Sequence, residues 1–229
     1  MKGSTVIIGV GPGLGASLAR RFAKAGDALI LAARNPDALE PLAEETNGLA
    51  LECDASRKGD VKRLFEQIDA AGESISTLIY NVGAYARGAI ADLDPEDVDR
   101  LIQINAFGGF LAAQEAARRM IPNGEGVMLF TGASAGIKGY ANSSAFAMGK
   151  FALRGMCQSL ARELAPQNIH VAHFVIDGMI YAPHRGSPFD DRDKCLDPDH
   201  IAETYLQIAS QPRSAWTWEM ELRPWCETF

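Results

Sequence analysis

Long hydrophobic runs and paired cysteines are both lacking in this chain of 229 residues. No stretch approaches the roughly 18 apolar residues of a membrane-spanning helix, and the apolar stretch near the N-terminus is too short for a signal peptide. The four cysteines include no Cys-x-x-Cys pair, so we expect neither a disulfide framework nor a metal site. Together these absences predict a cytoplasmic protein with no membrane partner.

An excess of basic residues is lacking as well. The chain has 22 lysines and arginines against 29 acidic residues, which gives a net charge of −7. A protein of this charge is poorly suited to bind nucleic acid or an anionic membrane. With 47% hydrophobic and 22% charged residues, the composition is that of a globular protein, and the length fits a single domain over residues 1–229.

Short apolar runs rich in β-branched residues alternate along the chain with longer stretches of helical periodicity. Continuous apolar runs are typical of strands buried on both faces of a parallel sheet. The alternation predicts an α/β fold of the Rossmann-like, doubly wound type, with a parallel sheet of about seven strands and helices on both faces. The expected strands are Thr5–Val10, Ala28–Ala33, Leu49–Cys53, Thr77–Tyr80, Val127–Thr131, Ile169–Ile176 and a last one near Thr217–Leu222.

One segment, residues 177–197, is rich in proline, glycine and charged residues and follows the sixth expected strand. Long irregular segments of this kind in a compact domain are commonly functional. We therefore interpret this segment as a loop that contacts a small-molecule substrate.

A glycine-rich turn, Gly9-Val10-Gly11-Pro12-Gly13-Leu14-Gly15, connects the first expected strand to the first helix. Glycines allow the tight turn, and they let a phosphate approach backbone N–H groups at the helix N-terminus, where a Cβ atom would block it. A purely structural turn is the alternative. The position between a strand and a helix, at the start of an alternating chain, favours dinucleotide binding.

The end of the second expected strand carries no carboxylate. An acidic residue there would hydrogen-bond the 2′-hydroxyl of an adenosine ribose, but the sequence is Ala33-Arg34-Asn35. Because a guanidinium can pair with a 2′-phosphate, Arg34 favours NADP(H) over NAD(H). A solvated arginine at a strand end is the alternative interpretation, and it leaves NAD(H) open as the cofactor.

The GxxxGxG spacing of Gly9, Gly13 and Gly15, with the chain length and the segment from Phe146 to Lys150, resembles the short-chain dehydrogenase/reductase family. The resemblance covers essentially the whole chain, although Ile8 stands where members usually have threonine. It implies an oxidoreductase that transfers hydride between a nicotinamide dinucleotide and a carbonyl/alcohol pair. The cofactor contacts that it implies, together with those expected above, are Gly9, Gly11, Pro12, Gly13, Leu14, Gly15, Arg34, Asn35, Asp54, Asn81, Val82, Gly83, Lys150 and Gly178.

The family's catalytic group consists of an asparagine, a serine and a Tyr-x-x-x-Lys pair, and this sequence matches it in part. Asn105 and Lys150 occupy the matching positions, where the lysine would hold the nicotinamide ribose. The tyrosine position is Phe146, whose ring can neither give nor take a proton. The serine spacing falls on Ala133, so strand alternation would turn Ser134 away from the nicotinamide unless the following turn re-aims it.

The missing tyrosine leaves three interpretations open. Another group could supply the proton, the substrate could need no such acid, or the protein could bind the dinucleotide without hydride transfer, as a non-redox enzyme or a regulator. Loss of general acid catalysis typically lowers a rate about 10²- to 10⁴-fold. The candidate replacement donors are Tyr85, Tyr140, Asp177, Tyr181 and His184.

Two long expected helices, residues 98–120 and 143–164, carry small apolar faces. In the family such helices commonly form a four-helix interface, which implies a homodimer or homotetramer. The three tryptophans lie within residues 216–225, where they fit a subunit interface or a cover for the core equally well. His170 and His173 have no second ligand at metal spacing, so we interpret them as core or edge residues of the sixth strand.

Overall fold

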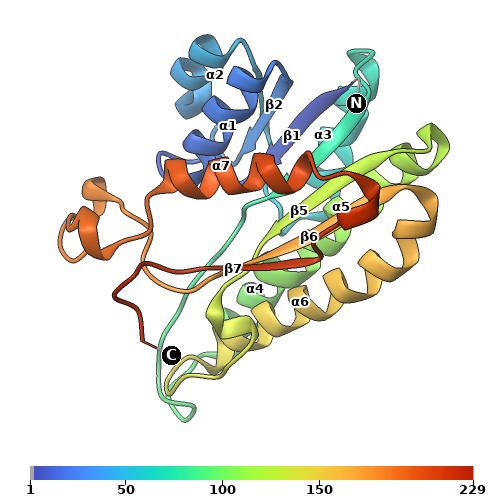
Figure 1. The fold of residues 1–229 in the computed structure, drawn as a ribbon. Coiled ribbons are helices and arrows are strands. Elements are labelled where there is room, and N and C mark those ends of the chain that lie inside the picture. Colours follow the sequence, from blue (N-terminus) through green and yellow to red (C-terminus); the bar gives the residue numbers. More distant parts are fainter. Residues whose placement is uncertain (1–2, 229) are drawn as a thin grey trace.

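The computed structural model describes residues 3–228, which contain one seven-stranded sheet with helices on both of its faces (Figure 1). All neighbouring strands are parallel, in the order β3-β2-β1-β4-β5-β6-β7. This confirms the predicted Rossmann-like, doubly wound fold. The strands are β1 (Ser4–Ile8), β2 (Ala28–Ala33), β3 (Leu49–Glu52), β4 (Ile75–Tyr80), β5 (Gly126–Thr131), β6 (Ile169–Ile176) and β7 (Glu219–Leu222). The helices are α1 (Leu14–Ala25), α2 (Glu40–Thr46), α3 (Lys58–Ala70), α4 (Pro95–Ile102), α5 (Gly108–Asn123), α6 (Ser144–Leu164) and α7 (Pro198–Ala209).

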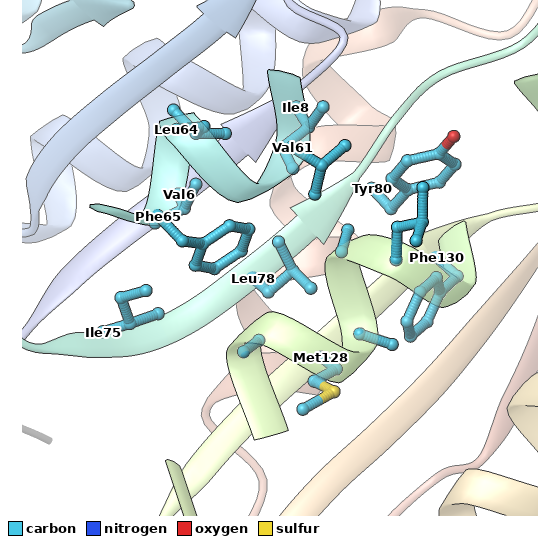
Figure 2. Close-up of a cluster of buried hydrophobic side chains, with 14 of the residues drawn as sticks. Val6, Ile8, Val61, Leu64, Phe65, Ile75, Leu78, Tyr80, Met128 and Phe130 are labelled. Atoms are coloured by element: carbon cyan, nitrogen blue, oxygen red, sulfur yellow. The ribbon is translucent and has the colours of Figure 1, made fainter. Parts of the chain in front are cut away.

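Each face of the sheet has its own hydrophobic core. Side chains of α3, α5 and α6 pack on one face, and those of α1, α2 and α7 pack on the other. Figure 2 shows part of the first core, in which Phe65 of α3 and Met128 of β5 lie on either side of Leu78 of β4. Because both faces are buried, the strands are continuous apolar runs in the sequence.

The strand order reverses at β1, since the chain runs outward through β2 and β3 and then returns to β4 on the other side of β1. At such a switch point the loops that leave the two central strands diverge, and a crevice opens at their carboxyl ends. Ile8, the last residue of β1, pairs with Ala32 of β2 and Tyr80 of β4. The segments that follow these strands therefore begin side by side.

The helix predicted over residues 98–120 is interrupted. Its first part ends at Ile102, a wider π-helical turn spans Gln103–Phe107, and α5 follows. The buried Tyr80 hydroxyl donates a hydrogen bond to the carbonyl of Ile104 at 2.7 Å. This bond satisfies a carbonyl within the wider turn, and wide turns of this kind are frequent at functional sites.

Three strands are shorter than predicted, and β3 lacks only the last predicted residue, Cys53. β1 ends at Ile8 because Gly9, with φ of 92°, already begins the turn. β7 begins at Glu219 because the side chain of Gln211 holds Thr217 outside the sheet. That side chain accepts a hydrogen bond from the Thr217 N–H at 2.7 Å and donates one to its hydroxyl at 2.9 Å.

Candidate active site

The glycines of the turn after β1 are of two kinds. A Cβ atom on Gly9 would lie 2.7 Å from a backbone oxygen of the segment after β4, and one on Gly15 would lie 2.8 Å from the Cα of Val10. These two glycines let backbone segments approach closely. Gly11 and Gly13 instead have no atom within 4 Å of such a Cβ, so their backbone faces open space at the N-terminus of α1, as a bound phosphate would require.

Two cavities, of about 900 and 1050 Å³, share a wall made of the glycine turn and the segment after β4. Arg185, in the loop after β6, lines both. The first is termed the lysine cavity, and the predicted residues in its wall are Gly11, Pro12, Gly13, Leu14, Gly15, Asn81, Gly83, Ser134, Phe146, Lys150 and Gly178. The second is termed the arginine cavity, and the predicted residues in its wall are Gly9, Gly11, Pro12, Arg34, Asn35, Asp54, Asn81, Val82 and Gly83.

Lys150 follows Phe146 by one turn of α6, so the two side chains project from the same face of the helix. Its ammonium donates a hydrogen bond to the carbonyl of Thr131 at 2.9 Å and lies 5.9 Å from the centre of the Phe146 ring. Only 3% of the residue is exposed, and this burial lowers the pKa of Lys150 to about 8. Burial keeps water away from this ammonium. A polar group of a bound ligand that reached the ammonium would take the place of that water.

The structure places Ser134 in the wall of the lysine cavity. A short 3₁₀ turn begins at Ser134, shortly after β5 ends, and breaks the strand alternation, so Ala133 and Ser134 both line the cavity. The Thr131 hydroxyl, at the end of β5, donates to the side-chain oxygen of Asn81 at 2.9 Å and lies 2.9 Å from the Tyr205 hydroxyl. Thr131 thereby ties β4, β5 and α7 together.

Asn105 lies in the π-helical turn and is fully buried. Its amide donates to the carbonyl of Ala84 at 2.8 Å, and its side-chain oxygen accepts from the N–H of the same residue at 3.1 Å. A Cβ atom on Gly83 would lie 3.7 Å from both the Asn105 oxygen and the Lys150 ammonium. Asn105 therefore fixes the segment after β4 in place beside Lys150, a role that the sequence motif alone did not indicate.

Residues of opposite charge line the arginine cavity. Arg34 and Asn35 follow β2 and are exposed in its wall, and Asp54 follows β3. The Asp54 carboxylate accepts hydrogen bonds from the N–H and the hydroxyl of Ser56 at 3.0 and 2.7 Å. Burial alone would raise the pKa of Asp54, but these bonds and the nearby Arg57 and Arg34 outweigh it and lower that pKa.

Asp177, directly after β6, is a buried ion-pair partner. Its carboxylate lies 3.1 Å from the Arg223 guanidinium and 3.9 Å from the Lys138 ammonium. Its N–H donates to the carbonyl of Leu222 at 2.9 Å. The side chain therefore joins the segments after β5, β6 and β7. Because Arg223 lies far along the chain, no local pattern could indicate this pairing.

The remaining candidate proton donors, Tyr85, Tyr140, Tyr181 and His184, all line the lysine cavity. The Tyr85 ring packs edge-on against Phe146, with ring centres 5.0 Å apart and an angle of 84° between the planes. Sequence reasoning missed other residues of this cavity, which no motif marks. They include Arg87, Arg185 and Glu227.

The segment after β7 packs against the loop after β6. Gly178 has φ of 140°, and a Cβ atom there would lie 2.7 Å from the ring of Pro224. The indole of Trp225 donates to the carbonyl of Asp193 at 3.2 Å. Because Glu227 lines the lysine cavity, this segment and the loop form one part of the cavity wall.

His170 and His173 are buried side chains of β6. The His170 ring stacks on Trp216, with centres 4.8 Å apart, and burial lowers the pKa of His173 to about 4. Within residues 3–228, no three His, Cys, Asp or Glu side chains are placed to hold a metal ion. In the same range, no helix is both long and apolar enough to cross a membrane.

The parallel sheet, the switch-point crevice and the glycine turn together define a dinucleotide-binding protein of the α/β class. The sequence profile of the short chain dehydrogenase family matches residues 4–192. The chain belongs to this family of oxidoreductases, which confirms the resemblance drawn from the glycine spacing and the Lys150 segment.

Three relatives illustrate the similarity. A sepiapterin reductase of Chlorobaculum tepidum is 29% identical over 237 aligned positions, which cover 98% of this chain and 97% of the relative. A solved short-chain dehydrogenase from Rhodopseudomonas palustris has a TM-score of 0.85 and 34% identity, over 97% of this chain and 98% of that one. A metagenomic short-chain oxidoreductase solved in complex with NADP has a TM-score of 0.83 over 96% of each chain, and its 23% identity makes this a likeness of fold.

Proposed function

We propose that this protein is an NADP(H)-dependent oxidoreductase that acts in the cytoplasm on a carbonyl/alcohol pair. One observation carries the proposal: the open backbone of the glycine turn, the Lys150 ammonium and the Ser134 residue line a single cavity. Such a wall offers places for a dinucleotide phosphate, a nicotinamide ribose and a substrate oxygen. The loop over residues 177–197, which lines the same cavity, would contact the substrate.

The cavities fit a phosphorylated dinucleotide. Gly11 and Gly13 leave the N-terminus of α1 clear, and the first turn of that helix carries no acidic side chain that would repel an anion. Arg34 brings positive charge to the arginine cavity, and Lys150 brings it to the lysine cavity. Bound NADP(H) would supply the hydride for a carbonyl/alcohol interconversion.

The residues of the chain would then orient the substrate. Ser134 is placed to hydrogen-bond the substrate oxygen, and Lys150 to bond the hydroxyls of the nicotinamide ribose. The Phe146 ring excludes water beside them and offers no proton. The proton that the substrate oxygen needs must therefore come from another group in the lysine cavity.

A fluorescence titration with NADPH, followed by its consumption with a panel of aldehydes, ketones and quinones, tests the proposal. We expect saturable binding and oxidation of NADPH by at least one of these compounds. Failure to bind NADPH or NADH would exclude every function considered for this site.

The phenylalanine at position 146 favours a second candidate function, in which the protein binds the dinucleotide without hydride transfer, as a non-redox enzyme or a regulator. Tight NADPH binding with no consumption would select this second function. Activity gained in Phe146→Tyr would then show that the lost hydroxyl is the reason.

Arg34→Asp is expected to shift the cofactor preference from NADPH toward NADH. The change removes a charge-assisted hydrogen bond worth about 1.5–3 kcal/mol, or roughly 10- to 100-fold in affinity. The new carboxylate can accept a bond from a free 2′-hydroxyl. The ratio of the two Kd values measures the shift, with Arg213→Asp in the exposed turn before β7 as the control. A ratio that Arg34→Asp leaves unchanged would remove Arg34 from the cofactor site.

We also propose that α4, α5 and α6 form the interface of a homodimer or homotetramer. Five large apolar side chains on or between these helices are 41–52% exposed, namely Phe107, Phe110, Ile121, Met148 and Phe151. The Phe107 and Phe110 rings stack at 5.9 Å and form one apolar patch. Light scattering should give the mass of an oligomer, and Phe151→Glu should move it toward that of a monomer. A monomeric wild-type protein would exclude this interface.

A further inference from the structure

A tyrosine and a lysine meet beside the lysine cavity, in the segment between β5 and α6. Tyr140 lines the cavity together with Ser134 and Phe146. The Lys138 ammonium lies 5.5 Å from the centre of the Tyr140 ring. The neighbouring Tyr140 hydroxyl raises the pKa of Lys138. This pair lies outside the helix that carries Phe146 and Lys150.

Local bonds hold the pair close to Ser134. The N–H of Lys138 donates to the carbonyl of Ser134 at 3.0 Å, and the N–H of Ser143 donates to the carbonyl of Tyr140 at 3.2 Å. On its other side, the Lys138 ammonium lies 3.9 Å from the buried carboxylate of Asp177. The cation is thus kept in place next to the phenol of a tyrosine that faces the same cavity as the serine.

We propose that Tyr140 supplies the proton that Phe146 cannot, and that Lys138 is the cation that stabilises its phenolate. The inference rests on the proposed function, because it names the proton donor of that reaction. In the reduction of a carbonyl compound, the carbonyl carbon accepts the hydride of NADPH, which becomes NADP⁺. The carbonyl oxygen takes the proton of the Tyr140 hydroxyl, and an alcohol results. The phenolate regains a proton from Lys138, which solvent reprotonates because its side chain is 40% exposed.

The other tyrosines of the cavity are less suited to this role. Tyr85 packs against the Phe146 ring, an apolar partner that does not stabilise a phenolate. The Tyr181 ring has the guanidinium of Arg192 5.6 Å from its centre. That guanidinium is bonded to the carboxylate of Asp197 at 3.0 Å, which offsets its charge. Of the three tyrosines, Tyr140 thus lies beside a cation whose ion pair is longer, at 3.9 Å to Asp177, than the bond between Arg192 and Asp197.

Tyr140→Phe tests the inference by removing one oxygen atom. We expect kcat to fall about 10²-fold or more, with little change in KM or NADPH affinity, because general acid catalysis typically contributes 10²- to 10⁴-fold. Adding Phe146→Tyr to this variant should restore turnover. Lys138→Met should also lower kcat, and Lys138→Arg should retain most of it because the charge is kept. Lys62→Met, on the exposed side of α3, is the control for the lost charge.

The pH dependence of kcat gives a second kinetic readout. The rate should fall at high pH as the donor loses its proton, and Lys138→Met should move this limb of the profile to a different pH. Besides Tyr140, the charged groups around Lys138 are Asp177 and Arg223. The control Lys62→Met should leave the profile unchanged, and an equal shift in both variants would exclude a specific role for Lys138.

The outcomes separate this inference from the proposed function. If the wild-type enzyme reduces carbonyl compounds no faster than Tyr140→Phe does, the inference is wrong and the proposed function is unaffected. A protein that binds NADPH but reduces no carbonyl compound overturns both. A loss of activity confined to Tyr85→Phe or Tyr181→Phe would also overturn the inference, because it would assign the proton to that residue.

A further readout needs neither cofactor nor substrate. Tetranitromethane nitrates phenolates, and mass spectrometry then locates the modified tyrosines. If exposure alone set the rate of nitration, Tyr85, which is 61% exposed, would react faster than Tyr140, which is 44% exposed. We expect Tyr140 to be nitrated faster in the wild-type protein, and several-fold more slowly in Lys138→Met than in Lys62→Met. Faster nitration of Tyr85, or equal Tyr140 rates in the two lysine variants, would overturn the role of Lys138.

Discussion

Lys150→Met is expected to weaken NADPH binding about 10- to 100-fold and to abolish most of the turnover. Methionine keeps an apolar side chain of similar length in α6 but removes the buried ammonium. A hydrogen bond to a charged group contributes about 1.5–3 kcal/mol, and each 1.4 kcal/mol or so is tenfold in affinity. A fluorescence titration with NADPH measures the change.

The control for this variant is Lys62→Met, which removes the same charge from the exposed side of α3 and should leave the Kd for NADPH unchanged. Lys150→Met should unfold at a Tm no lower than that of the wild type, because burial already disfavours the charged form of Lys150. Unaltered NADPH affinity in a folded Lys150→Met protein would place the nicotinamide ribose elsewhere.

Leu78→Ala is expected to lower the free energy of unfolding by about 2–5 kcal/mol, the usual range for truncating a fully buried leucine. Leu78 lies in the central strand β4, paired with Val6 on one side and Met128 on the other, and it is 0% exposed (Figure 2). The truncated side chain would leave a cavity between the sheet and α3. Denaturant unfolding measures the loss as a lower midpoint with an unchanged slope.

Leu49→Ala provides the matched comparison, because it deletes the same atoms from an edge strand. Leu49 begins β3 and is 44% exposed, so we expect a change within about 0.5 kcal/mol. The difference between the two changes in the free energy of unfolding measures the effect of burial. Equal losses in both would mean that the core on the α3 side contributes less to stability than its packing indicates.

The features of the fold that could be predicted are those with local signals. The strands were readable because residues buried on both faces must be apolar, and the turn after β1 was readable because Gly9 needs a positive φ. The interruption between α4 and α5 could not be predicted in the same way. It depends on a bond between the Tyr80 hydroxyl and the Ile104 carbonyl, which come from different elements.

The candidate site likewise contains some features that could be predicted from the sequence and others that could not. The glycine turn and the Phe146–Lys150 segment were found because their spacing carries a physical requirement, and the residues that they mark lie in the two cavities. The orientation of Ser134 depends on the 3₁₀ turn that begins there, which strand alternation does not describe. The pairing of Asp177 with Arg223 joins distant parts of the chain and leaves no local pattern.

The segment after β7 contributes to the cavity without contributing to the sheet, which ends at Leu222. Arg223 holds Asp177, Pro224 covers Gly178, and Glu227 reaches the cavity wall. A truncation after Leu222 would leave all strands in place, but it would remove Glu227 from the cavity wall and Arg223 from the buried Asp177 carboxylate. A change at Glu227 therefore alters the cavity wall and keeps this buried ion pair, whereas a change at Arg223 breaks the pair and is expected to lower stability.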